Sequence, residues 1–393
     1  MDDSILKSLR TFSVWILLGL LFLNFRLDCI IQVENDWRDK KMNSHNYSYP
    51  LDLSWTTKEM ETVIAMFRAV EDAYEVAIDR DKILDCYRAF KQVVPSKAEE
   101  KQLGREFEKN SGYVLYRVVK AAQESTDKRI KMVRQKMISI EELDQKAQQI
   151  IRQAGQNAYQ KMENDYQIDT KTNYTDLVTT IDRENEQLIN DQLRKIDPDS
   201  QILSEEGFGD KQISNMQGHV WIVDPIDGTM NFVKQHNNFA VMLALYVDGQ
   251  PMLGYILDVI NNRLYHGRKG AGVYVNNQKI GQPADLGLRE SLLAMNRTLT
   301  LSGDSALKKI AQDAIGLRMY GSAGIEVIGV ITGQLGGYIS NLKPWDLAAG
   351  RMLAEELDLV VKSIDGSSIN VLSSNLVLVA TRQVSRDIRQ IIN

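Results

Sequence analysis

The chain has 393 residues, enough for two or three domains, and a formal net charge of −5, which leaves no basic excess for binding nucleic-acid phosphates. Its two cysteines, Cys29 and Cys86, have no partners at metal-ligand spacing, and its four histidines form no H-x-x-x-H pair. The composition therefore argues against a disulfide framework and zinc hydrolase chemistry, and it directs any metal chemistry to carboxylates and hard cations such as Mg²⁺.

The first segment, residues 1–41, contains an apolar stretch at 12–25 (FSVWILLGLLFLNF). A membrane-spanning helix needs about 20 apolar residues, and an extension to 12–31 would bury two charged residues. Three interpretations stay open: a membrane anchor through 12–31, a signal peptide, or an extension that precedes a working start at Met42. We expect a cytoplasmic protein, with the N-terminal anchor as the alternative.

Residues 42–132 have the pattern of a small helical domain. Thr56-x-x-Glu59 and Ser96-x-x-Glu99 match the capping box that opens a helix. Apolar residues recur at three- and four-residue steps behind these starts, and four helices are expected in all. The opening NYSYPLDLSWTTKEM resembles the start of a family of short, uncharacterised bacterial proteins, and this resemblance implies no activity.

A linker is expected at 133–139, and the charged stretch 125–136 predicts a linker or a solvated helix. Beyond it, a helix should begin behind Ser139. Runs rich in β-forming residues predict strands at 219–223, 239–247, 252–257 and 374–380. Hairpin turns are expected at 247–250 and 276–277. This mixture predicts a layered α/β fold with a substantial antiparallel sheet, in a domain at 140–393.

The most informative segment is 221–232 (WIVDPIDGTMNF). An apolar strand enters it, and the proline after Asp224, which cannot extend a ladder, is expected to end that strand. Asp224 and Asp227 then lie across a turn, where two carboxylates repel each other unless a cation lies between them. Gly228 permits close backbone approach, and Thr229 should begin a short helix whose N–H groups suit a phosphate. These features predict a metal and phosphate site.

Three further elements contribute acidic residues. Glu205 follows an apparent strand in 202–207 (ILSEEG), Asp182 ends 176–182 (DLVTTID), and Asp346 lies in 343–350 (KPWDLAAG). Taken singly, each has an ordinary explanation as a solvated turn, a helix cap or a first-turn acid.

Together the four elements, in this order and spacing, resemble the motifs of the inositol monophosphatase family over about residues 140–393. The resemblance implies an αβαβα sandwich, here preceded by the small all-α domain, and usually a homodimer. It also implies a Mg²⁺-dependent, lithium-sensitive phosphoric monoester hydrolase that holds two or three ions per site. Its partner would be a small phosphorylated metabolite.

The resemblance assigns roles to individual residues. The implied metal ligands are Glu205, Asp224, the backbone carbonyl of Ile226, Asp227 and Asp346. Asp182 and Thr229 would orient and deprotonate the attacking water, with Glu205 as a further catalytic residue. The implied substrate-binding residues are Asp227, Gly228, Thr229, Gly321, Ser322 and Ala323. Lys171 would belong to a loop that folds over the metals.

One position departs from the family pattern. Many members carry a glutamate that binds inositol hydroxyls seven residues before the aspartate of the WD pair, and Ile339 stands at that position here. An isoleucine cannot accept those hydrogen bonds, so the case for inositol phosphate as the preferred substrate is weakened.

The leading hypothesis is Mg²⁺-dependent hydrolysis of a small phosphate monoester by an activated water, with inositol monophosphate as the family default. An NADP(H) 2′-phosphatase or a fructose-1,6-bisphosphatase is the alternative, because related families use the same site. A non-catalytic regulatory or dimerisation scaffold is a third possibility. The intact acids at 205, 224, 227 and 346 argue against that scaffold.

Overall fold

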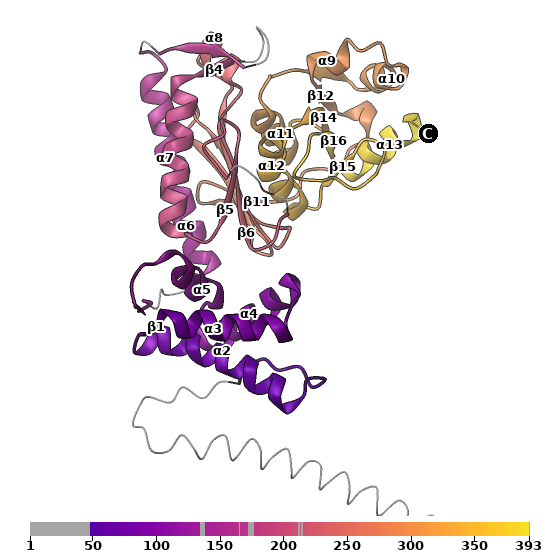
Figure 1. Cartoon of the computed structure of the whole chain (residues 1–393). Coiled ribbons are helices and arrows are strands. Elements are labelled where there is room, and N and C mark those ends of the chain that lie inside the picture. The colour runs from indigo at the N-terminus through magenta and orange to yellow at the C-terminus, as the bar shows by residue number, and fades with distance from the viewer. Residues whose placement is uncertain are drawn as a thin grey trace, which may run out of the picture. The chain divides into compact units, whose positions relative to one another are not determined.

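The computed structural model describes residues 48–133, 138–164, 166–171, 177–210, 213 and 215–392. They form two compact units, which divide between residues 137 and 138 (Figure 1). The apolar stretch at 12–25 lies outside these ranges, as does Asp176. Within them, no helix combines the length and apolar character needed to cross a bilayer.

The N-terminal unit contains the four expected helices: α2 (Thr57–Glu75), α3 (Arg80–Val93), α4 (Lys97–Ser111) and α5 (Leu115–Glu124). The Thr56 hydroxyl accepts from the backbone N–H of Glu59, and the Glu59 carboxylate accepts from the backbone N–H of Thr56, which completes the predicted capping box. The core is aromatic: Phe67 and Phe107 are fully buried and stack with ring centroids 4.4 Å apart.

The expectation of a linker or solvated helix over 125–136 is wrong in part. A two-residue strand, β2 (Arg129–Ile130), pairs antiparallel with β1 (Ile78–Asp79). Ile130 is buried in the aromatic core, and this burial holds the strand against the helices, whereas residues 134–136 lie outside the described ranges.

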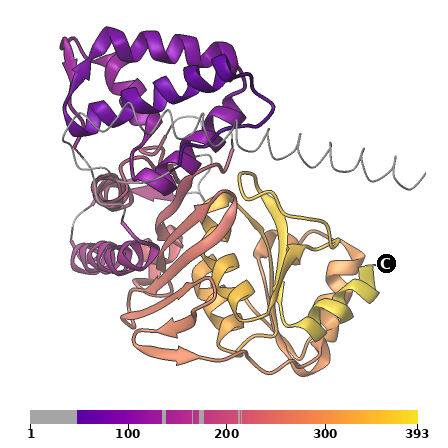
Figure 2. The same cartoon turned by 90° about the horizontal axis from the view of Figure 1, so that it is seen from below.

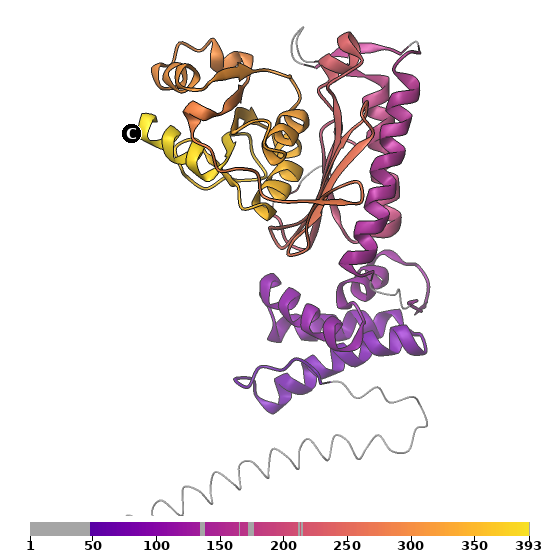
Figure 3. The same ribbon diagram turned by 180° about the vertical axis from the view of Figure 1, so that it is seen from behind.

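The C-terminal unit has the predicted αβαβα layers (Figures 1 and 3). The first layer is α6 (Ile140–Lys161) and α7 (Thr180–Ile196). The second is a seven-stranded sheet in the order β11-β10-β9-β8-β7-β6-β5. Its strands are β5 (Gln201–Ser204), β6 (His219–Asp227), β7 (Ala240–Val247), β8 (Gln250–Asp258), β9 (Arg263–Arg268), β10 (Gly272–Val275) and β11 (Gln278–Ile280).

The third layer is α11 (Ala323–Ile331) and α12 (Pro344–Glu356), which lie between the two sheets (Figure 2). The second sheet has the order β13-β12-β14-β16-β15. Its strands are β12 (Leu292–Met295), β13 (Gly316–Arg318), β14 (Gly337–Leu342), β15 (Val360–Ser363) and β16 (Asn375–Ala380). The outer helices are α9 (Arg297–Thr300), α10 (Ser305–Asp313) and α13 (Arg382–Ile392). Shorter elements are β3 (Ile168–Thr170), β4 (Leu177–Thr179), α8 (Thr229–Gln235) and the 3₁₀ turn at Leu288–Glu290.

Three apolar clusters fill the spaces between these layers. One joins α6 and α7 to the larger sheet around Trp221, and a second joins both sheets to α11 and α12 around Tyr246. A third lies outside the smaller sheet, under α10 and α13. Both expected hairpin turns are present: Asp248 and Gly249 join β7 to β8 with positive φ, and Asn276 begins the turn from β10 to β11.

The predicted end of β6 at Pro225 is wrong. The strand continues to Asp227, where pairing with β7 resumes after a register shift that begins at Asp224. Proline is tolerated at a bulge because that position has no ladder hydrogen bond to donate. The chain therefore carries both acids on one irregular strand and not across a turn.

Candidate metal and phosphate site

The bulge in β6 places two of the predicted acids. Asp224 lies opposite Met242 of β7 and Asp227 lies opposite Ala240, so β6 has one extra residue over this interval. A bulge redirects side chains, and here both aspartates are buried, with 1% of Asp224 and 5% of Asp227 exposed. The strand thus ends on two desolvated carboxylates.

The third acid comes from α12. Asp346 occupies its first turn, where its Oδ2 accepts from the backbone N–H of Lys343 at 2.9 Å. Asp224, Asp227 and Asp346 each place one carboxylate oxygen within 4.8 Å of those of the other two. The fold therefore brings Asp346 to two acids that lie more than a hundred residues earlier in the sequence.

The cluster is electrostatically strained without a cation. Burial, followed by the charges of Glu205 and Asp227, raises the pKa of Asp224 well above its usual range. Burial and the charge of Asp227 raise the pKa of Asp346 to about 7, and burial raises that of Asp227 to about 6. Oxygen donors converging in this way are what Mg²⁺ takes from proteins, so the residues present fit a hard divalent cation.

Asp227 also caps the N-terminus of α11. Its Oδ1 accepts from the backbone N–H of Ala323 at 2.9 Å, and its Oδ2 accepts from the N–H of Gly324 at 2.7 Å and from the hydroxyl of Ser322. The predicted substrate-binding segment at 321–323 is therefore attached to one of the acids.

Gly228 connects the acid cluster to the same segment. Its φ is +87°, and a Cβ at this position would lie 2.9 Å from Cβ of Ser322 and 3.4 Å from the carbonyl oxygen of Gly321. Only glycine fits both the backbone conformation and the space. Thr229 then begins α8, as predicted.

A second arrangement joins Asp182 to Thr229. Asp182 is fully buried in the first turn of α7, where the backbone N–H and hydroxyl of Thr179 donate to its Oδ2. Its Oδ1 lies 2.9 Å from the Thr229 hydroxyl, which is also 3.1 Å from the carbonyl oxygen of Ile226. The predicted pair is thus in hydrogen-bond contact.

Glu205 lies near the cluster of Asp224, Asp227 and Asp346, but it is not one of the three acids whose oxygens converge. Lys171 Nζ is 2.9 Å from Glu205 Oε1 and 2.5 Å from Glu206 Oε1, and Lys343 Nζ is 3.9 Å from Glu205 Oε1. The negative charge of Glu205 still contributes to the raised pKa values of Asp224 and Asp346. The ammonium of Lys171 offsets part of the negative charge of Glu205 and Glu206.

Comparison with known proteins decides the family. A model of the inositol monophosphatase family matches residues 139–392. The chain belongs to that family. The family resemblance predicted from the four motifs is confirmed. The protein is a phosphoric monoester hydrolase, as the members of the inositol monophosphatase family are.

Individual members of the inositol monophosphatase family are similar over nearly their whole length. Inositol-1-monophosphatase of Bacillus subtilis (strain 168) is 38% identical over 252 residues, which cover 63% of this chain and 95% of that protein. A solved IMPase/NADP phosphatase complexed with Mg²⁺ and phosphate is 29% identical with a TM-score of 0.60, covering 64% of this chain and 95% of that one. A staphylococcal inositol monophosphatase-1 in a lithium-soaked inhibitory complex is 30% identical, with a TM-score of 0.61, covering 65% and 96%.

The N-terminal unit belongs to a second family. A model of the uncharacterised protein family UPF0223 matches residues 46–131. A UPF0223 protein of Streptococcus pneumoniae (serotype 19F) is 57% identical over 86 residues, which cover 22% of this chain and 94% of that protein. The predicted resemblance to short bacterial proteins is confirmed.

Ile339, where many inositol monophosphatase family members carry glutamate, is fully buried in β14. It packs in the outer cluster with Leu293, Met295 and Leu378, between the smaller sheet and α10 and α13. Its neighbour Tyr338 belongs instead to the inner cluster, which contains α11 and α12. The isoleucine therefore has a packing role on the outer face of the smaller sheet.

Sequence reasoning missed the buried polar residues that support the site. Glu186 of α7 accepts from the hydroxyl of Ser204 at 2.6 Å and from the backbone N–H groups of residues 206 and 208. Asn231 donates to the carbonyl oxygens of Asn238 (2.8 Å) and Tyr320 (2.6 Å). The sequence of α7 could have indicated Glu186, because its polar residues share the helical spacing of the apolar face.

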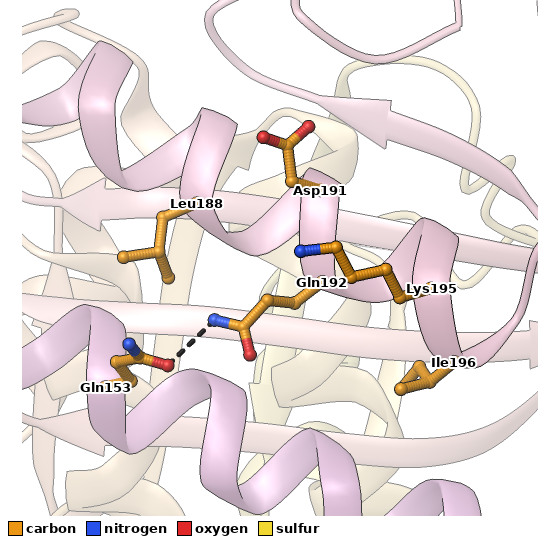
Figure 4. Close-up of a pocket in the computed structure, with 6 residues that line it drawn as sticks. All are labelled: Gln153, Leu188, Asp191, Gln192, Lys195 and Ile196. Carbon is orange, nitrogen blue, oxygen red and sulfur yellow. Dashed lines mark hydrogen bonds between the residues drawn. The ribbon is translucent and has the colours of Figure 1, made fainter.

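A hollow on the molecule lies between α6 and α7 (Figure 4). It is lined by Gln153, Leu188, Asp191, Gln192, Lys195 and Ile196. Gln192 donates to Gln153 across it at 2.8 Å. None of these residues belongs to the acid cluster, so this hollow is separate from the candidate site.

Proposed function

We propose that the protein hydrolyses a small phosphate monoester with Mg²⁺, and that the attacking group is a water molecule. One observation carries the proposal: Asp224, Asp227 and Asp346 each place one oxygen within 4.8 Å of the others, in a buried position where their charges repel. A non-catalytic scaffold has no need for such an arrangement, which lowers stability unless a cation binds.

The residues that would hold the metal are Glu205, Asp224, the carbonyl oxygen of Ile226, Asp227 and Asp346. Mg²⁺ bound there would neutralise phosphate charge, lower the pKa of water and stabilise the leaving alkoxide. Uncatalysed phosphate monoester hydrolysis is slow enough to leave up to about 10²¹-fold for an enzyme to supply. We expect two or three ions per site, as in the family pattern.

The chain's own residues position the water and the phosphate. The Thr229 hydroxyl donates a hydrogen bond to Asp182 Oδ1, so it would pass its own proton to Asp182 as its oxygen takes a proton from water. The buried Asp182 has a raised pKa because of its burial, which favours a carboxylate that takes up a proton readily. The backbone N–H groups of Gly228 and Thr229 would donate to phosphate oxygens.

Inositol monophosphate is the default substrate of the proposal, and NADP(H) 2′-phosphate or fructose 1,6-bisphosphate is the second candidate. Ile339 favours the second candidate, because its side chain is buried in the outer cluster and offers no oxygen to inositol hydroxyls. A solved IMPase/NADP phosphatase has a similar fold.

A phosphate-release panel tests the proposal. The full chain would be assayed with Mg²⁺ on inositol phosphates, NADP, fructose 1,6-bisphosphate and nucleoside phosphates, with EDTA as the matched control. We expect release on at least one substrate, abolished by EDTA and inhibited by Li⁺. Release that persists in EDTA would contradict the role of the metal, and no release on any substrate would favour the scaffold.

We further propose that residues 140–393 form the catalytic domain, with 42–132 as a separate helical domain and 133–139 as the linker, and that the catalytic domain forms a homodimer. Light scattering on the full chain tests the assembly: twice the chain mass is expected, and a monomer at assay concentration would contradict it.

A further inference from the structure

The loop after β5 carries Glu205, and three hydrogen bonds attach this loop and the last residue of β5 to Glu186 of α7. Glu186 Oε1 accepts from the hydroxyl of Ser204 at 2.6 Å and from the backbone N–H of Phe208 at 2.7 Å. Glu186 Oε2 accepts from the backbone N–H of Glu206 at 2.5 Å. The residues on both sides of Glu205 are therefore fixed to one side chain.

Glu186 is itself fully buried. An unpartnered carboxylate at this depth would be costly, so three donors converging on it indicate a strongly determined arrangement. A second connection comes from Asn190, one helical turn further along α7, whose side-chain amide lies 3.4 Å from Ser204 Oγ. The loop also folds back on β5, where the N–H of Asp210 donates to the carbonyl oxygen of Ile202 at 2.7 Å.

We propose that Glu186 is the positioning residue for Glu205: its buried carboxylate fixes residues 204, 206 and 208 so that the Glu205 side chain faces the acid cluster. This inference rests on the proposed function, in which Glu205 is a metal ligand. Glu186 does not touch the metal or the substrate. It acts through the loop, in the way that groups behind metal ligands orient those ligands.

The choice of a carboxylate follows from the three donors. An amide at this position has one acceptor oxygen and one donor nitrogen, so Glu186→Gln loses at least one acceptor that faces a backbone N–H. The loop would then sample other conformations, and Glu205 would spend less time in the geometry that binds metal. Loss of such supporting groups typically costs about 10- to 100-fold in metal affinity or activity.

Calorimetric titration of Mg²⁺ into the full chain tests the inference without any turnover. We expect Glu186→Gln to weaken Mg²⁺ binding by about 10- to 100-fold. Ser204→Ala, which removes one of the three donors, should weaken it by a smaller factor. Glu184→Gln is the matched control, because Glu184 is a half-exposed residue of the same helix that pairs with Lys161, and it should leave the affinity unchanged.

The outcomes separate the two proposals. A folded Glu186→Gln protein with wild-type Mg²⁺ affinity would overturn the positioning role while the proposed function stands. If that variant does not fold, Ser204→Ala decides: weaker binding supports the inference and unchanged binding overturns it. Absence of Mg²⁺ binding by the wild-type chain would instead contradict the proposed function, and the inference with it.

Discussion

Single residues in this site serve two purposes at once. Asp227 contributes an oxygen to the acid cluster and also accepts three hydrogen bonds from the first turn of α11. These bonds lower its pKa against the larger effect of burial, which raises it to about 6. A residue that caps a helix in this way is held in one orientation, and this fixes its free lone pairs for a cation.

A substitution at Ile339 tests whether this side chain points into the apolar cluster outside the smaller sheet. Because it packs among Leu293 and Met295, Ile339→Glu would bury an unpaired carboxylate in an apolar cluster. We expect a loss of about 3–5 kcal/mol in the free energy of unfolding and no gain of inositol phosphate turnover. Ile339→Val, the control, should cost about 0.5–1.5 kcal/mol. Urea unfolding and phosphate release measure both, and a stable Glu variant with increased turnover would contradict the packing role.

The acids of the cluster were predictable from the sequence because each lies in a short motif with a conspicuous spacing. Glu186 was not, because its partners are backbone groups in a loop that becomes adjacent only in the folded chain. The pattern of α7 nevertheless indicated the position of Glu186, because Asp182, Asn185 and Glu186 share the buried face of this helix with Ile189. Polar residues on an apolar helical face indicate a buried network, although the spacing does not name its partners.

At the scale of elements, the bulge in β6 is the feature that local reasoning described incorrectly. Pro225 was expected to end the strand, yet pairing resumes at Asp227 because the neighbouring strand β7 continues past it. Pairing with β7 therefore outweighed the local effect of the proline. The bulge accommodates Pro225, which has no backbone N–H to donate to the neighbouring strand. The helix starts at Thr56, Ser96 and Ser139 were predicted correctly, because a capping interaction involves only residues three apart.

The turn from β6 into α8 depends on Gly228. Gly228→Ala would place an alanine at φ +87°, which costs about 1–2 kcal/mol, and would also press its Cβ against Ser322. Gly270→Ala is the matched control, because Gly270 has φ +77° and its added Cβ would meet nothing within 4 Å. We expect both variants to lose stability, with a further loss of about 1–3 kcal/mol and a loss of phosphate release only at position 228. Equal effects in thermal melts and activity assays would contradict the close packing.

At the scale of the whole molecule, the acid cluster makes stability depend on pH. Burial raises the pKa of Asp346 and of Glu206 to about 7 and that of Asp227 to about 6. The folded, metal-free chain therefore binds more protons than the unfolded chain between about pH 4 and pH 7. Its stability falls as the pH rises through that window, because the buried acids must then ionise away from water and repel one another in the folded state.

Thermal melts with and without Mg²⁺ test this dependence. In EDTA, the melting temperature should be lower at about pH 8 than at about pH 5. Mg²⁺ binds the ionised acids, so millimolar Mg²⁺ should raise the melting temperature strongly at the higher pH and little at the lower. An equal shift at both pH values would contradict a carboxylate site.

The layered architecture was predicted through the family motifs, whereas the alternation of strands and helices alone indicated only an α/β fold with an antiparallel sheet. Strand order was not available from the sequence, because the sheets contain both parallel pairs, such as β5 with β6, and antiparallel pairs, such as β6 with β7. Both sheets pack against α11 and α12, and local sequence patterns do not encode such long-range contacts.

The most direct test of the account is phosphate release by Asp224→Asn in the presence of Mg²⁺. Asparagine has the same shape and no charge, so it removes a metal ligand and also relieves repulsion within the buried cluster. We expect turnover to fall by at least about 10³-fold, equivalent to about 4 kcal/mol in the barrier, while the melting temperature in EDTA stays the same or rises. Normal turnover by a folded Asp224→Asn protein would contradict the assignment of the metal site.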